Sequence, residues 1–459
     1  MINNKRTRLL CISFIILIIL LFMLFLIGNF FIPPYIKNIE IKENNIYKDQ
    51  NIININVENP FYKLNKEVYC FVSTSDEIPD ENNEWVKANN GYCSFSITSG
   101  DYNIFVKDKY GNIQSLNDQS YNINKILDIK TNKDIFYMYK GMNDKITYEL
   151  NVIGNVDKTI SFASEDENVV SVDNIGNIKA KGFGTANVIL SSNGVKKNIK
   201  IVVTNLITTP QINSKKNYIS CGQFSEEEAN MLDQILFDRI NDAGYKTRAG
   251  VVAAARFLSL EFSYRIHYFY ENGRLNNYSP YLYVDGEGRY YHRGLYLNKN
   301  KFNEIKSKFV GPAIWGCDLQ NYTDWGPYVA GQYYPNGLDC SGFVTWALLN
   351  GGFDIGDIGA GASEEHNDLD DLGKKVYITD ELMNSGKVKV GDLIGLNGHM
   401  AILAGWDDNY YYVAESLNTT GGVVMTIVAK DDLVSNSIYE YIILMDDVYK
   451  EDGNYSTKW

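Results

Sequence analysis

The sequence has no excess of positive charge. It also lacks the short motifs typical of metal-binding and nucleotide-binding proteins. It carries 43 Lys and Arg residues against 56 Asp and Glu residues, a formal net charge of −13. Such a chain has no general footprint for nucleic-acid phosphates, so we expect no nucleic-acid partner. It also contains no H-E-x-x-H sequence, no paired C-x-x-C sequence and no phosphate-binding loop ending in Gly-Lys-Ser/Thr. We therefore expect neither a metal nor a cofactor.

Histidine is scarce, with four residues in the whole chain. His366 lies in the acidic segment 364–371, which we interpret as a solvated loop rather than a cation site. His267 and His292 lie among tyrosines and are expected to form local hydrogen bonds. His399 is the one left to consider for acid–base chemistry.

Charge is also absent from residues 9–31, which are almost wholly apolar. At ~1.5 Å per residue, a helix of this length crosses about 30 Å of hydrocarbon. Lys5, Arg6 and Arg8 precede the run, and positive charge stays on the cytoplasmic side of a membrane. The sequence predicts a single-pass signal-anchor in the cell membrane with the C-terminal part outside. A cleaved signal peptide is the alternative, although no A-x-A-like site follows the run.

The six cysteines fit an extracellular chain, because disulfides form and persist outside the cytoplasm. Cys11 lies inside the apolar run, and Cys340 belongs to a motif described below. The other four allow three pairings. Their positions along the chain favour Cys70 with Cys93 and Cys221 with Cys317; the alternative is four unpaired thiols.

The first half of the chain outside the membrane has the pattern of β-strands. Residues 37–125 contain short alternating segments separated by turns, as in a β-sandwich. Residues 168–190 read NVVSVDNIGNIKAKGFGTANVIL, in which residues 174–177 are expected to form a turn between two strands. This run resembles the bacterial Ig-like group 2 domain, which implies a non-catalytic spacer or adhesion module at 126–206. The block before it resembles another Ig-like sandwich.

The composition changes after residue 210, where helical spacing begins. Ser225 and Glu228 form a capping-box pattern in front of a helix. A second helix is expected over residues 247–270. Two interpretations of region 215–325 remain open: a helical and irregular extension of the catalytic region, or a separate wall-binding piece.

The strongest chemical signal is the segment NGLDCSG at residues 336–342, followed by an apolar helical run. It places Cys340 at the start of a helix, where backbone N–H groups and the helix dipole stabilise a thiolate. Downstream, His399 begins an apolar strand after a glycine, where it can act as the base for Cys340. Glu415 lies on the next strand and is expected opposite His399, where it would orient the imidazole. The alternatives are a buried structural cysteine, a structural histidine and a surface glutamate.

These residues belong to four motifs in order: PYVAG at 327–331, DCSG at 339–342, GDL at 391–393 and GHMAI at 398–402. Together they resemble the NlpC/P60 family of cysteine peptidases over residues 326–450. The resemblance implies an α+β papain-like fold and hydrolysis of peptidoglycan stem peptides, commonly at the D-γ-glutamyl–diamino acid bond. It also implies substrate-binding roles for Tyr328, Asp339 and Ser341. Two positions depart from the family: Ala330 replaces a frequent Trp, and Glu415 replaces the usual His, Asn or Gln.

The expected architecture is therefore a multidomain chain with one transmembrane helix, two all-β sandwiches and a C-terminal α+β peptidase domain. Its parts are a basic tail at 1–8, the anchor at 9–31, sandwiches at 37–125 and 126–206, the extension at 215–325 and the peptidase domain at 326–450. Three other functions remain open. One is an amidase of related fold that cuts between the sugar and the stem peptide, and another is a non-catalytic surface protein that binds wall peptide. The third is acyl transfer or cross-linking by the same fold, which would require an amine acceptor.

Overall fold

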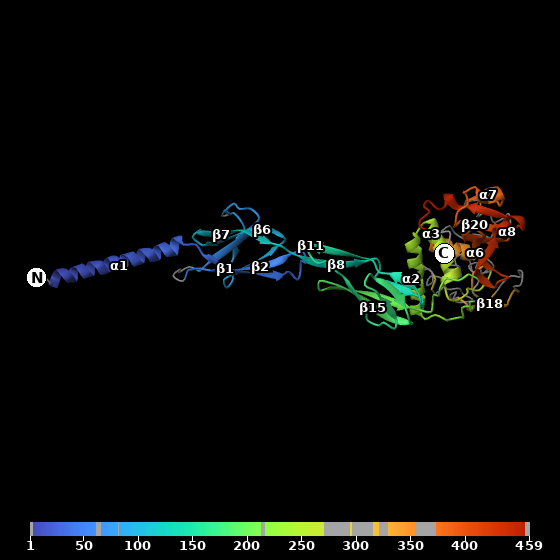
Figure 1. Cartoon of the computed structure of the whole chain (residues 1–459), viewed down its shortest axis with the longest axis horizontal. Helices are drawn as coiled ribbons and strands as arrows, with labels where there is room; N and C mark the ends of the chain where they lie inside the picture. The colour runs from blue at the N-terminus through green and yellow to red at the C-terminus, as the bar shows by residue number, and fades with distance from the viewer. Residues whose placement is uncertain are drawn as a thin grey trace.

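A computed structural model describes residues 3–60, 66–80, 82–212, 216–269, 294–295, 315–320, 329–353 and 373–454. Most of the regular secondary structure in these residues is β-strand. Figure 1 shows the elements following one another along the molecule, from a single helix at the N-terminal end, through two β units, to a unit of mixed helices and strands.

Helix α1 (Asn3–Phe31) has the length and composition needed to cross a membrane. Within its segment Arg8–Phe31, the most apolar 18-residue window has a mean hydropathy of 3.4, and none of that window is buried against the rest of the chain. Pro33 and Pro34 follow directly, and proline cannot continue a helix because it lacks the N–H donor. The expected apolar helix is thus present; the choice between an anchor and a cleaved signal stays a prediction.

The first β unit consists of two sheets that face each other across an apolar core. One sheet has the order β1-β2-β5 and the other the order β4-β3-β6-β7. Their bounds are β1 Tyr35–Glu43, β2 Asn51–Glu58, β3 Val68–Ser73, β4 Val86–Lys87, β5 Tyr92–Ile97, β6 Gly100–Asp108 and β7 Ile113–Tyr121. The Cys70–Cys93 disulfide joins β3 to β5 and so links the two sheets through the core.

The second β unit has its own apolar core and three small sheets. Their orders are β10-β14-β13, β11-β8 and β12-β15-β16-β9, and β16 pairs with β9 in parallel. The bounds are β8 Lys125–Thr131, β9 Ile135–Met138, β10 Asn143–Lys145, β11 Tyr148–Ile153, β12 Ser161–Ser164, β13 Val170–Val172, β14 Asn177–Ala180, β15 Gly184–Ser192 and β16 Val195–Val203. The expected turn at 174–177 lies between β13 and β14. Asp173 stabilises it by accepting hydrogen bonds from Ile175 and Asn177.

The C-terminal unit is built on a six-stranded antiparallel sheet with the order β19-β24-β20-β21-β22-β23. The bounds are β19 Lys374–Tyr377, β20 Leu393–Leu396, β21 His399–Trp406, β22 Tyr410–Leu417, β23 Gly422–Ala429 and β24 Tyr441–Leu444. A separate pair, β17 (Asp318–Gln320) and β18 (Tyr333–Pro335), leads into the segment before Cys340. Alternate apolar residues of β21, such as Ile402 and Leu403, belong to different core clusters, so both faces of the sheet are covered.

Helices cover the two faces of this sheet. The bounds are α2 Glu226–Ala243, α3 Arg248–Arg256, the π-helix η1 Phe257–Glu261, α6 Cys340–Asn350, α7 Asp380–Asn384, α8 Lys430–Ser435 and the short 3₁₀ helix η4 Met445–Asp447. Residues of α2, α3 and α6 share one core with β21 and β22. The described part of region 215–325 therefore shares the core of the C-terminal unit.

The prediction of a helix over residues 247–270 was wrong for the C-terminal half of that range. Thr247 caps α3 as expected, but regular α-helix ends at Arg256 and the π-helical turn ends at Glu261. Phe262 has extended backbone and bridges to Ile207, and His267 bridges to Gly337. The aromatic residues after Glu261 thus form pairs with distant strands, a tertiary gain that outweighs helix continuation.

The second disulfide, Cys221–Cys317, ties the segment before α2 to strand β17. The backbone carbonyl of Cys317 accepts a hydrogen bond from Asn336, four residues before Cys340. Both pairings favoured by the sequence are therefore confirmed, and the second one braces the approach to α6.

Arg248 connects α3 to the sheet through an ionic cluster in which Arg248 and Asp392 are buried, while Asp446 and Asp452 are about half exposed. Its guanidinium lies 2.6 Å from Asp392, 2.6 Å from Asp446 and 3.1 Å from Asp452. The side chains of Arg248 and Asp392 are 0% and 1% exposed. A buried charge is tolerated only when it is paired, so neither residue of this pair can be removed without stranding the other.

We expect Arg248→Met to lower the free energy of unfolding of the C-terminal unit by about 3–5 kcal/mol, because Asp392 would stay buried without its cation. The measurement is urea denaturation of the full chain followed by tryptophan fluorescence. Lys181→Ala is the control, because Lys181 pairs with Glu167 on the surface and both side chains are well exposed. An equal midpoint for the two variants would contradict the buried cluster.

Candidate active site

Helix α6 begins at Cys340 because the residue before it is a well-placed cap. Asp339 has extended backbone, and its Oδ1 accepts hydrogen bonds from the Gly342 N–H at 2.5 Å and from the Ser341 hydroxyl at 3.2 Å. Apart from Leu349, every residue of α6 is buried, so the helix is held on all sides. The expected position of Cys340 at a helix N-terminus is therefore present.

The Cys340 thiol lies where α6 meets the start of strand β21. Its side chain is 5% exposed, and its Sγ is 3.9 Å from the carbonyl oxygen of Gly398, the residue before His399. With Cys70, Cys93, Cys221 and Cys317 in disulfides, the free thiols are Cys340 and Cys11 of α1. Cys340 is thus a free thiol beside a histidine.

His399 and Glu415 form a hydrogen-bonded ion pair, with 2.7 Å between His399 Nε2 and Glu415 Oε2. The sequence expectation that they lie directly opposite was wrong in register. Ile402 pairs with Ala414, and continuing this antiparallel register puts Leu417 opposite His399 and Ala401 opposite Glu415. The two side chains therefore meet along a diagonal on one face of the sheet, which long side chains can span.

This contact fixes which ring nitrogen of His399 can act as a base. Nε2–H donates to the carboxylate, so Nδ1 is the nitrogen that remains for the Cys340 thiol. Burial by itself lowers the pKa of His399, but hydrogen bonds with Cys340 and Glu415 and the charges of both outweigh it and raise the pKa to about 9. The arrangement therefore favours the protonated form of His399, which lies between Cys340 and Glu415.

Tyr439 is a member of this cluster that the sequence analysis missed. Its hydroxyl donates to Glu415 Oε2 at 2.9 Å, and its ring stacks at 6.3 Å from the His399 ring. Burial, together with the charge of Glu415 and the hydrogen bond to it, raises the pKa of Tyr439 well above its ordinary value, so the phenol stays protonated. No local motif marks Tyr439, which is 24 residues from Glu415 and lies between α8 and β24.

The predicted substrate-binding residues have different positions. The side chains of Asp339 and Ser341 are 4% and 1% exposed and are bonded to each other at the start of α6. Their observed role is therefore to shape the helix N-terminus, and substrate contact stays a prediction. Tyr328 lies outside the described residues, as does the acidic segment around His366. Within the described residues, no group of three or more His, Cys, Asp or Glu side chains is placed to hold a metal ion.

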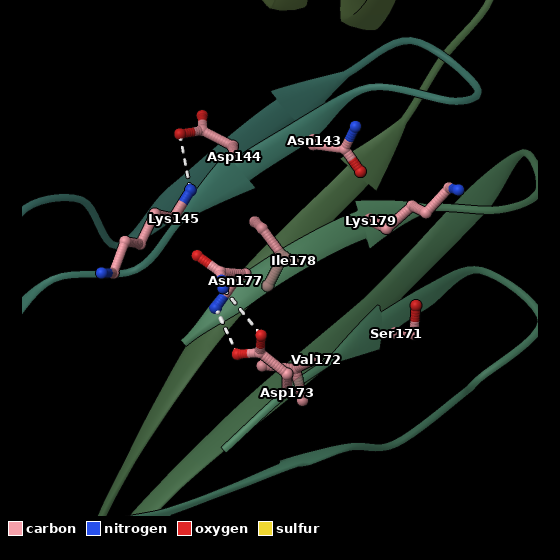
Figure 2. Close-up of a pocket in the computed structure, with 9 residues that line it drawn as sticks. All are labelled: Asn143, Asp144, Lys145, Ser171, Val172, Asp173, Asn177, Ile178 and Lys179. Carbon is pink, nitrogen blue, oxygen red and sulfur yellow. Dashed lines mark hydrogen bonds between the residues drawn. The ribbon is translucent and has the colours of Figure 1, made fainter. Parts of the chain in front are cut away.

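A recess of about 730 Å³ lies in the second β unit, away from Cys340 (Figure 2). It is lined by residues of β10, β13 and β14 and contains no cysteine or histidine. Asp173 in its wall is already bound to Asn177 through both backbone and side chain, and Asp144 accepts from the Lys145 N–H. Its polar groups thus stabilise the local backbone.

No family model matches the chain, and no curated protein matches it. Among solved structures, domains 4 and 5 of the S-layer protein SbsC are similar with 17% identity and a TM-score of 0.17, over 24% of this chain and 67% of that one. A longer SbsC structure matches with 11% identity and a TM-score of 0.18, over 38% of this chain and 36% of that one. The insect immune protein hemolin matches with 12% identity and a TM-score of 0.21, over 37% of this chain and 46% of that one. Likeness at this level says nothing about the site.

The structure predicts that the pKa values of two histidines, His399 and His267, are shifted in opposite directions. His399 should titrate near pH 9, whereas burial lowers the pKa of His267 below its ordinary value. In Glu415→Gln the negative charge that favours the imidazolium is lost, so the pKa of His399 should fall while that of His267 stays unchanged. The measurement is NMR of the full chain with labelled histidine rings, the His399 signal being the one absent from His399→Gln. A wild-type His399 midpoint below 6.5 would show that desolvation prevails over the two anions.

Proposed function

We propose that the chain is a membrane-anchored cysteine endopeptidase of the NlpC/P60 type that cuts peptidoglycan stem peptides outside the cell. The observation that carries this proposal is the position of Cys340, at the first residue of a helix and beside the His399–Glu415 pair. The order of the four sequence motifs supports it independently. A helix packed on an antiparallel sheet, with the thiol on the helix and the histidine on the sheet, is also what a papain-like domain requires.

In the proposed reaction, His399 Nδ1 takes the proton of the Cys340 thiol, and Glu415 stabilises the resulting imidazolium. The thiolate attacks a stem-peptide carbonyl, commonly that of D-glutamate in this family. The imidazolium then protonates the leaving amine, and water releases the acyl group from Cys340. Each step uses groups that the fold already holds within reach of one another.

The start of α6 supplies the stabilising dipole for the developing oxyanion. The first N–H groups of a helix have no partner within the helix, and the Asp339 side chain accepts only that of Gly342. The backbone N–H of Cys340 is therefore the donor that we assign to the oxyanion. The negative Asp339 carboxylate is held back by its two hydrogen bonds, away from the position of the thiolate.

The rest of the chain fits a tether. Helix α1 serves in this proposal as a single-pass signal-anchor, and the two β units serve as Ig-like spacers that carry the peptidase toward the wall (Figure 1). The first β unit and the C-terminal unit each contain one disulfide, which agrees with an extracellular location.

The test is digestion of purified peptidoglycan by the full-length chain in detergent, with fragments read by mass spectrometry. We expect fragments that end at D-glutamate, and a rate at least about 10⁴-fold lower for Cys340→Ala. Glu415→Gln can still accept from Nε2–H but carries no charge, so its rate should lie between those of wild type and Glu415→Ala.

Other fragment patterns separate the alternatives. Release of whole stem peptides from the sugar would replace the endopeptidase with an amidase. Equal digestion by wild type and Cys340→Ala would remove Cys340 from the mechanism. Binding of peptidoglycan without fragments from either folded protein would favour the non-catalytic surface protein.

A further inference from the structure

The buried carboxylate of Glu415 has an uneven set of partners. Its Oε2 accepts from His399 Nε2 at 2.7 Å and from the Tyr439 hydroxyl at 2.9 Å. Its Oε1 is buried and has no hydrogen-bond partner among the described residues. The side chain is 2% exposed, so solvent does not replace missing donors. The two hydrogen bonds to Oε2 are therefore the ones that orient this carboxylate.

The backbone fixes Tyr439 independently of His399. The next residue, Glu440, donates its N–H to Gly395 on β20 at 2.8 Å and accepts from Ile378 at 3.0 Å. The Tyr439 ring is 4% exposed and packs in the core beneath the sheet, on the face that α7 and α8 cover. The phenol is thus a donor held in place by the fold, whereas His399 must be free to exchange protons.

We propose that Tyr439 is a positioning residue of this site: its phenol keeps the Glu415 carboxylate ionised and directed at His399, and through that pair keeps Cys340 in its reactive thiolate form. The physical reason is that a hydrogen bond to the charged form of a buried carboxyl group favours that form. Without the phenol, the carboxylate of Glu415 would keep its bond to His399 but lose the fixed donor that favours its charged form. A protonated Glu415 no longer favours the imidazolium, and the thiolate of Cys340 loses its counter-ion.

The titratable groups around this cluster come from four elements. His399 on β21 and Tyr439 before β24 contact Glu415 of β22, and His399 also faces Cys340 of α6. Tyr441 of β24 lies near Cys340, and burial together with the charge of Cys340 raises the pKa of Tyr441 to about 12. Tyr441 therefore stays neutral over the pH range of the test, and the changes measured there come from Cys340, His399 and Glu415.

The inference rests on the proposed use of Cys340 as a nucleophile and not on the bond that is cut. The test is the rate of Cys340 alkylation by iodoacetamide between pH 5 and pH 9, because alkylation reports the thiolate without any substrate. All proteins are full-length and carry Cys11→Ala, which leaves Cys340 as the one free thiol. Cys340→Ala in the same background gives the blank.

We expect Tyr439→Phe to move the alkylation midpoint to higher pH by about one unit, which lowers the rate at pH 6 about tenfold. Tyr449→Phe is the matched control. Tyr449 is equally buried and also loses a single hydrogen bond, its 3.2 Å contact with the Gly391 carbonyl, but it lies over Arg248. The midpoint of Tyr449→Phe should equal that of wild type.

The direction of the shift decides the proposal. The phenol could instead reduce the stabilisation that Glu415 gives to the His399 imidazolium. In that case Tyr439→Phe would move the alkylation midpoint to lower pH. A shift to lower pH, or no shift, overturns the proposal. In Glu415→Gln, Tyr439→Phe should have no further effect on the midpoint, since Tyr439 acts through the carboxylate.

Two arrangements keep the test decisive. If Tyr439→Phe does not fold, 3,5-difluorotyrosine at position 439 keeps the ring and donates a stronger hydrogen bond, so the midpoint should move to lower pH; no shift or an upward one overturns the proposal. A wild-type midpoint at the ordinary thiol value overturns this inference, whereas the proposed function is decided by the digestion of peptidoglycan. A shift in Tyr439→Phe without any digestion of peptidoglycan supports Tyr439 and rejects only the substrate.

Discussion

The packing of helix α6 against strands β21 and β22 is the contact on which the site depends. The helix is apolar on nearly every side, and it shares a core with both strands and with α2 and α3. Burial of this helix brings its first residue, Cys340, to the strand end where His399 begins. Because close-packed cores resist displacement, the thiol and the imidazole are held together by residues that take no part in proton transfer.

Two buried charges in the same unit are handled in different ways. Arg248 is surrounded by three carboxylates, so its charge is more than balanced and holds α3 to the sheet. Glu415 is paired with His399, which gains and loses a proton in the proposed reaction, so the charge that balances Glu415 changes during that reaction. A fixed donor such as Tyr439 is what a carboxylate in that position requires, because a half-satisfied buried anion is costly.

Expectations from the sequence were most accurate where the signal is local. The capping box at Ser225 and Glu228, the turn before Asn177 and the capped start of α6 are all present, since each depends on hydrogen bonds within a few residues. The helix after Thr247 was expected to be too long, because the aromatic residues beyond Glu261 bind distant segments instead. The pairing of His399 with Glu415 was expected, but its diagonal register depends on how two strands align.

By itself the sequence determined the apolar N-terminal helix, the β-rich first half, the thiol at a helix start and a histidine and glutamate on neighbouring strands. These follow from hydrophobic periodicity, capping residues and turns, which act over short distances along the chain. Only the tertiary structure decided which nitrogen of His399 binds Glu415 and that Tyr439 is the second donor to this carboxylate. It also decided that the other oxygen of Glu415 is buried without a hydrogen-bond partner in the described part of the chain. Those features depend on the alignment of strands and on side chains brought together across the core, for which no local pattern in the chain carries a signal.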